Sequence, residues 1–309
     1  MAFRKIGANL TRSYRNDFSS LAEDLARLKS LGPDFVEIWP ELLGLVVAGE
    51  LNRDRTNRTK EILLDSDLSF TVHAPLEINL MDLRSGLPHR ETLAASVRFA
   101  GDIGAEVVVC HAGQRHAGRD ALTSFKDQLA AEREALREAG DLAGESDITI
   151  AVENHYPELP VVLGDIYDYS ARPSELAEMV SGLDHPSVAV CLDTGHAALS
   201  AAAFGFDLFE ECAAAAPLVR HVHLQDNFQK VNLAGEPPVS EHRAFGLGDL
   251  HLPPGSGTIP LVELFERINF PQDPSCCAEL SDEFAHLAGE ALRGARAIAR
   301  RATREPIAS

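Results

Sequence analysis

The chain alternates eight times between a short run of apolar and β-branched residues and a longer run rich in Ala, Leu, Glu and Arg. The longer runs carry apolar residues at helical spacing, as at Leu21, Leu25 and Leu28. Eight strand–helix units in succession predict an α/β fold, a closed parallel (β/α)8 barrel. The predicted strands are residues 3–9, 34–39, 69–73, 106–111, 149–153, 188–193, 221–224 and 276–280.

One interval between the predicted strands differs from the others. The seventh and eighth strands are about 55 residues apart, which is long for a strand–helix unit. The interval contains a segment rich in Pro and Gly, residues 227–257, which we expect to form a long loop over the barrel mouth. No repeat, linker or low-complexity tract interrupts the chain, so the sequence predicts a single domain over residues 1–309.

Acidic residues outnumber basic ones, 47 against 28, and give a formal net charge of −19. This charge argues against a nucleic-acid partner and against an anionic membrane surface, because both are bound through clustered Lys and Arg. The net charge does not exclude a small phosphorylated substrate. The sequence has no visible secretory leader, no membrane-spanning apolar run and no CxxC motif among its five cysteines, so we expect a cytoplasmic protein with reduced thiols.

A charged or imidazole side chain lies at, or one residue before, the end of each of the last six predicted strands. Strands of a parallel barrel are buried on both faces, so such a side chain is costly there unless it is paired or binds a metal. The C-terminal strand ends of a barrel converge on the active site. Imidazoles and carboxylates together suit Zn, Mn, Fe or Co. The six residues are His73, His111, Glu153, Asp193, His223 and Glu279.

Two further segments could add ligands to this set. His196 follows the sixth strand in the sequence Asp-Thr-Gly-His, and the long loop contains Asp249 and His251 ahead of a Gly-x-Gly turn. An isolated loop Asp or His is more often solvated than a ligand. Taken with the six strand ends, however, these side chains predict a shared site for divalent metal ions, one to three per chain.

The order of these motifs resembles the xylose-isomerase-like TIM-barrel superfamily over residues 6–280. Its epimerase members imply that the chain is a divalent-metal-dependent sugar or sugar-phosphate isomerase or epimerase. Glu153 and Glu279 would also form the acid–base pair, and His196, His73 and His111 would contact substrate. The four metal ligands implied by this comparison are Glu153, Asp193, His223 and Glu279.

The same superfamily contains the endonuclease IV type of apurinic nuclease, which implies a di- or trinuclear metal phosphoesterase as the alternative function. The chain departs from the nuclease where that enzyme contacts DNA. Leu76 replaces an inserting aromatic residue, and Trp39-Pro40-Glu41 replaces a basic loop. The alternative substrate is therefore a small molecule rather than DNA. The residues that match the trinuclear ligands are His73, His111, Glu153, Asp193, His196, His223, Asp249, His251 and Glu279.

Three other residues are candidates for substrate binding. Glu37, near the end of the second strand, could line the mouth or cap the next helix, and His155 should lie at the rim. Arg243 in the long loop could clamp a phosphate or carboxylate, or could be solvated. The expected partner is a small sugar or phosphorylated compound. A homodimer and a metal-loaded binding protein without catalysis stay open as alternatives.

Overall fold

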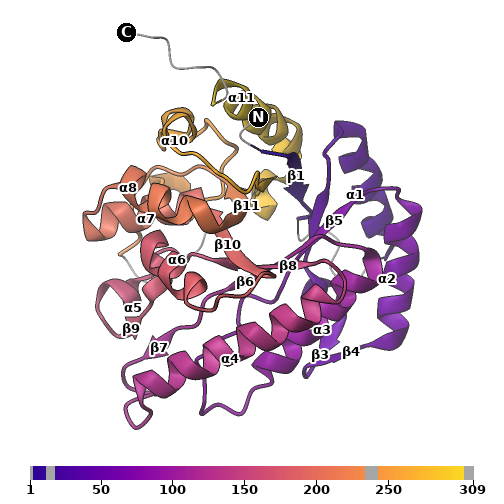
Figure 1. The fold of residues 1–309 in the computed structure, drawn as a ribbon. Coiled ribbons are helices and arrows are strands. Elements are labelled where there is room, and N and C mark those ends of the chain that lie inside the picture. Colours follow the sequence, from indigo (N-terminus) through magenta and orange to yellow (C-terminus); the bar gives the residue numbers. More distant parts are fainter. Residues whose placement is uncertain (1–2, 12–17, 234–242, 303–309) are drawn as a thin grey trace.

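Eight parallel strands close into a barrel in the computed structural model, which describes residues 3–11, 18–233 and 243–302 (Figure 1). The barrel strands are β1 (Lys5–Asn9), β2 (Val36–Ile38), β5 (Phe70–His73), β6 (Val107–His111), β8 (Thr149–Glu153), β10 (Val188–Asp193), β11 (Val219–Leu224) and β12 (Ser275–Ala278). Neighbours in the ring follow chain order, and β1 pairs with β12. The predicted (β/α)8 barrel is therefore confirmed.

Helices cover the outside of the barrel (Figure 1). Many of the longer ones bury a row of apolar side chains, as Leu21, Leu25 and Leu28 show, each at most 1 % exposed. The longer helices are α1 (Phe18–Leu31), α2 (Arg53–Asp65), α3 (His89–Ile103), α4 (Phe125–Gly144), α6 (Pro173–Ser181), α7 (Thr194–Phe204), α8 (Leu208–Ala215), α10 (Leu261–Arg267) and α11 (Ala288–Arg301). The short turns are α5 (Leu159–Val162), η2 (Pro40–Leu43), η3 (Tyr169–Ala171), η4 (Ala216–Leu218) and η5 (Asp282–Leu287).

The strands bury two separate layers of side chains. The main apolar core lies between the sheet and the helices. A second, small core inside the barrel consists of Val107, Val109, Ala151 and Cys191. Side chains two residues apart on a strand share a face, so His111, Glu153 and Asp193 continue this inner layer at the C-terminal strand ends. The barrel interior thus changes from apolar to polar towards its mouth.

The ring closes where β1 meets β12. The Asn9 side chain donates to the Leu280 carbonyl at 2.9 Å and accepts from the Leu280 N–H at 2.9 Å. Helix α11 packs beside β1, so the two ends of the barrel sequence lie together (Figure 1). This seam joins the first and last barrel strands next to Glu279, which is 3 % exposed.

Two small antiparallel ribbons lie outside the barrel, and neither is among the predicted elements. One pairs β3 (Val46–Val47) with β4 (Glu50–Leu51), and the other pairs β7 (Arg115–His116) with β9 (Ile166–Tyr167). All five cysteines are buried and free. Among the helices of the described residues, none combines the length and apolarity needed to cross a membrane.

Candidate metal centre at the barrel mouth

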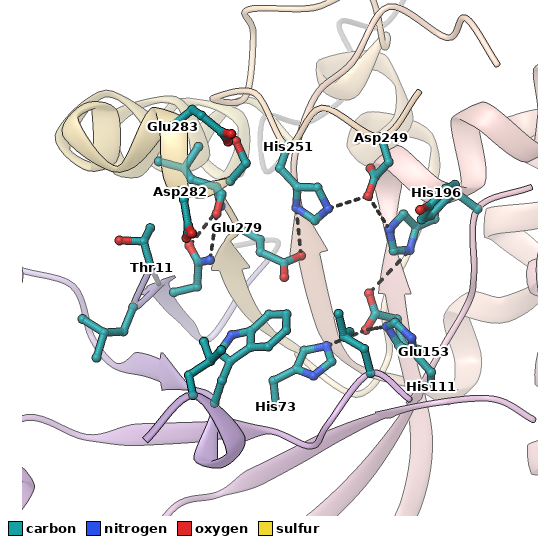
Figure 2. A pocket seen from close by; sticks show the side chains of 18 residues that line it. Thr11, His73, His111, Glu153, His196, Asp249, His251, Glu279, Asp282 and Glu283 are labelled. Carbon is teal, nitrogen blue, oxygen red and sulfur yellow. Dashed lines mark hydrogen bonds and ion pairs between the residues drawn. The ribbon is translucent and has the colours of Figure 1, made fainter. Parts of the chain in front are cut away.

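A cavity of about 320 Å³ opens at the C-terminal ends of the strands (Figure 2). Two predicted ligands, Asp193 and His223, are each 0 % exposed and contact the side chains that line this cavity. The structure therefore brings all nine predicted ligand residues together. The seven that line the cavity itself are His73, His111, Glu153, His196, Asp249, His251 and Glu279.

Glu153 lies at the centre of these contacts. Its Oε2 is 3.2 Å from Nε2 of both His73 and His111, and its Oε1 is 2.9 Å from Nδ1 of His223. Burial opposes ionisation of this carboxyl, but His223 and His111 hold its pKa well below its usual range. Burial and the neighbouring His155 lower the pKa of His111 to about 4, which leaves a neutral imidazole suited to metal binding.

Asp193 has an oxygen that no donor satisfies. Its Oδ1 accepts the His196 backbone N–H at 2.6 Å and so caps α7. Its Oδ2 is buried without a hydrogen-bond partner among the described residues. Burial, opposed by His196 and reinforced by the Glu153 and Glu279 carboxylates, raises the pKa of Asp193 to about 7. A buried, unsatisfied carboxylate oxygen among other carboxylates fits a cation.

The loop after β11 supplies a further group of donors. Nε2 of His251 is 2.6 Å from Asp249 Oδ2, and Nε2 of His196 is 3.2 Å from the same oxygen (Figure 2). Nδ1 of His251 is 3.4 Å from Glu279 Oε2, which joins this group to the strand ends. Burial lowers the pKa of His251, but Asp249 and Glu279 outweigh it and raise that pKa to about 9.

The donor atoms fall into compact groups of a size that could hold metal ions. Within each group the ligand atoms lie within 4.8 Å of one another. Imidazole nitrogen mixed with carboxylate oxygen is the chemistry of zinc, manganese and iron sites. Three of these groups combine the predicted ligands, namely His73 with His111 and Glu153, His73 with His223 and Glu279, and His196 with Asp249 and His251.

Gln225 connects two of the predicted ligands and was not found by sequence reasoning. Its Nε2 donates to Asp249 Oδ1 at 2.6 Å and to Asp193 Oδ1 at 3.3 Å. Gly195 makes this approach possible, because a Cβ there would lie 2.1 Å from the Gln225 side chain. The glycine in Asp-Thr-Gly-His was the available signal, since it marks a close approach by another group.

Asp226 holds the long loop in place and was also missed. Its carboxylate accepts the backbone N–H groups of Gly255, Gly257 and Ile259 at 3.0, 2.9 and 3.2 Å. A Cβ on Gly257 would lie 2.4 Å from Asp226 Oδ1. The Gly-x-Gly turn therefore serves to wrap the backbone around this carboxylate, and Asp249 is presented from the same loop.

The three predicted substrate-binding residues lie outside the lining of the cavity. Glu37 is 0 % exposed and lies beneath the predicted ligands rather than at the mouth or at a helix cap. His155 is bound to Asp168, with Nδ1 2.8 Å from Oδ2, and its ring packs edge-on to His111 at 4.4 Å. Arg243 pairs with Glu283 of the cavity lining, at 2.8 Å.

The fold and the donor set define a (β/α)8 barrel with a candidate metal centre at its C-terminal mouth. The chain belongs to the xylose isomerase-like TIM barrel family, whose sequence model matches residues 25–300. This confirms the resemblance seen in the strand-end motifs. None of the curated proteins matches the sequence.

Several solved structures share the fold. The chain is similar to a D-tagatose 3-epimerase-like protein, with TM-score 0.66, 18 % identity and coverage of 96 % of this chain and 99 % of that one. It is similar to a D-psicose 3-epimerase determined in the presence of D-fructose, with TM-score 0.63, 13 % identity and coverage of 96 % of this chain and 98 % of that one. It is also similar to a xylose isomerase-like TIM barrel protein from Mycobacterium smegmatis in complex with magnesium, with TM-score 0.65, 17 % identity and coverage of 97 % of this chain and 96 % of that one. At these identities the likeness shows the barrel fold.

Proposed function

We propose that the protein is a divalent-metal-dependent sugar or sugar-phosphate isomerase or epimerase. One observation carries the proposal. Glu153 and Glu279 come from two different strands, both line the cavity, and both contact the same atom, His223 Nδ1, at 2.9 and 3.2 Å. Two carboxylates around one position can serve as base and acid for a substrate bound between them.

Four residues would hold the metal ion of this reaction, and two of their buried oxygens, Asp193 Oδ2 and Glu279 Oε2, have no hydrogen-bond partner among the described residues. When bound, a divalent ion would polarise a substrate carbonyl. The proposal is supported by the D-psicose 3-epimerase and the magnesium-bound relative among the similar structures. The four residues are Glu153, Asp193, His223 and Glu279.

The protein side chains would carry the proton transfer. One of Glu153 and Glu279 takes the proton as the C–H bond next to the carbonyl breaks. The other returns a proton, to the opposite face of the same carbon in an epimerase or to the neighbouring carbon in an isomerase. His196, held by the Asn154 carbonyl at 2.8 Å, would orient a substrate hydroxyl. Trp39 lies on the opposite wall, stacked on His73 with ring centroids 4.2 Å apart, and offers an apolar surface to a sugar.

A second candidate function is a small-molecule phosphoesterase with two or three metal ions. The specific observation that favours it is the group of His196, Asp249 and His251, whose donor atoms lie within 4.8 Å of one another. A one-metal isomerase does not require this group. In a phosphoesterase, several ions together stabilise the attacking and leaving oxygens of the phosphoryl group.

Metal content and one double variant separate the two functions. The isomerase should bind about one ion per chain and the phosphoesterase two to three. In an isomerase, Asp249→Ala with His251→Ala should keep its ion and raise KM more than it lowers kcat. In a phosphoesterase, it should lose at least one ion together with phosphoester turnover.

Both activities would be assayed on sugar and phosphoester panels. The control is Asp273→Ala with His286→Ala, which removes the same residue types from exposed positions. Loss of metal and of phosphoester turnover in the Asp249/His251 variant alone would overturn the isomerase proposal. Retained metal together with sugar turnover would support it.

A further inference from the structure

Glu37 is buried beneath the candidate metal centre and faces two imidazoles of β11. Its Oε1 lies 3.1 Å from Nε2 of His223, and its Oε2 lies 3.3 Å from Nε2 of His221. Thr71, its register partner on β5, donates its hydroxyl to Oε2 at 3.0 Å.

The contact between Glu37 and β11 crosses the inside of the barrel. In the ring, β1 and β12 stand between β2 and β11. Gly7 of β1 and Cys277 of β12 lie at the register level of His223, and both are small. A Cβ on Gly7 would lie 2.5 Å from the Phe35 ring, so Phe35 fills the space at Gly7, while the Glu37 carboxylate reaches across to β11. Such a placement is costly for a carboxylate unless its oxygens have partners. Oε2 accepts from Thr71, whereas Oε1 and the His223 Nε2 that it faces at 3.1 Å have no other hydrogen-bond partner among the described residues.

His223 presents a different nitrogen to each side. Its Nε2 faces Glu37, while its Nδ1 faces Glu153 Oε1 and Glu279 Oε2. A histidine ligand usually donates its other ring N–H to a carboxylate, which fixes both the tautomer and the orientation of the ring. With the hydrogen on Nε2, the lone pair of Nδ1 points at the position between the two Glu carboxylates.

We propose that Glu37 is a positioning residue, which holds Nε2–H of His223 and so makes Nδ1 the atom that binds the metal ion. His221 supports the arrangement, because Ser275 Oγ lies 2.8 Å from its Nδ1 while its Nε2 faces the second oxygen of Glu37. The inference rests on the metal centre of the proposed function and is independent of which reaction that centre performs.

The test measures metal affinity rather than turnover. Zn²⁺ and Mn²⁺ dissociation constants would be obtained by competition with a chelator for the full chain and for Glu37→Gln and Glu37→Leu. We expect Glu37→Leu to weaken binding by about 10- to 100-fold and Glu37→Gln by less, because glutamine keeps an acceptor for Nε2–H. Thr71→Val, which removes only the hydroxyl donor to Glu37, covers the case in which Glu37→Leu fails to fold.

The matched control is Glu211→Gln. Glu211 is a nearly buried carboxylate, 7 % exposed, that pairs with Arg172 on the outside of the barrel. Its replacement should leave metal affinity unchanged. A crystal structure of the zinc-loaded protein should place the ion at Nδ1 of His223. Unchanged affinity in the Glu37 variants, an ion at Nε2, or a wild-type chain that binds neither metal overturns the inference. A protein that binds metal as expected but turns over no sugar overturns only the proposed function.

Discussion

Glu153 and Glu279 share one neighbour, His223 Nδ1, and are the residues on which the proposed reaction depends most. Glu153→Gln and Glu279→Gln should each lower turnover at least about 1000-fold, because each change removes a base and a metal ligand while keeping the side-chain shape. Circular dichroism and the unfolding midpoint should stay near those of the parent. Near-parental turnover in either variant would show that the chemistry lies elsewhere.

Glu132 offers a test at a single buried residue outside the metal centre. It accepts from Gly113 N–H and the Tyr169 hydroxyl, and burial raises its pKa to about 7. The native state therefore holds the Glu132 proton more tightly than the unfolded chain does. The stability that Glu132 contributes falls as the pH rises from the pKa of Glu132 in the unfolded chain towards 7.

Glu132→Gln keeps both acceptor contacts but cannot ionise. Relative to the parent, its free energy of unfolding should rise by about 2–3 kcal/mol between pH 5 and pH 8. Urea unfolding at several pH values measures this difference. Glu138→Gln, at an exposed carboxylate of the same helix, is the control variant. A difference that does not change with pH would mean that Glu132 is ionised throughout.

The predicted ligands could be found from the sequence because each lies near a strand end or beside a recognisable turn. A barrel gathers its strand ends, so position along the strand is sufficient information. Glu37 and Gln225 could not be placed in this way. The alternation of side chains along the strand predicts which face of the sheet Glu37 lies on, but not how deep in the barrel it lies. Its contact with His223 crosses the inside of the barrel. Gln225 depends on the space left by Gly195, which only the folded chain defines.

At the scale of elements, the loop after β11 depends on Asp226. Asp226→Asn replaces one of its two acceptor oxygens by a donor that faces backbone N–H groups of the loop. We expect a loss of about 1–3 kcal/mol in the free energy of unfolding and faster proteolysis within residues 243–258. Asp147→Asn is the control, because Asp147 is exposed and has a positive φ of 56° that Asn tolerates equally. Equal effects from both changes would rule out a holding role for Asp226.

The order of strands and helices could be predicted because apolar periodicity differs between them. The two ribbons could not, since each strand has only two residues and is defined by its partner. The last helix illustrates the same limit. Residues 284–298 carry continuous helical spacing, yet η5 ends at Leu287 and α11 begins at Ala288. Sequence periodicity does not distinguish a 3₁₀ turn that leads into an α-helix.

At the scale of the whole molecule, charge governs which partners can approach. With a formal net charge of −19, the protein should not bind duplex DNA at physiological salt, abasic or intact. Fluorescence anisotropy with the metal-loaded protein measures this. An intact DNA duplex of mixed sequence serves as the reference ligand. Submicromolar binding to abasic duplex that weakens steeply with salt would contradict the expectation and favour a nuclease.

The seam between β1 and β12 also sets an order of events during synthesis. Domains emerge from the ribosome N-terminus first, so Glu279 leaves last among the proposed ligands, and until then β1 and β11 are open edges able to pair with other chains. The hydrogen bonds between Asn9 and Leu280 close the seam next to Glu279. An ion that requires Glu279 binds only the closed ring. Its binding free energy therefore stabilises the closed barrel against reopening.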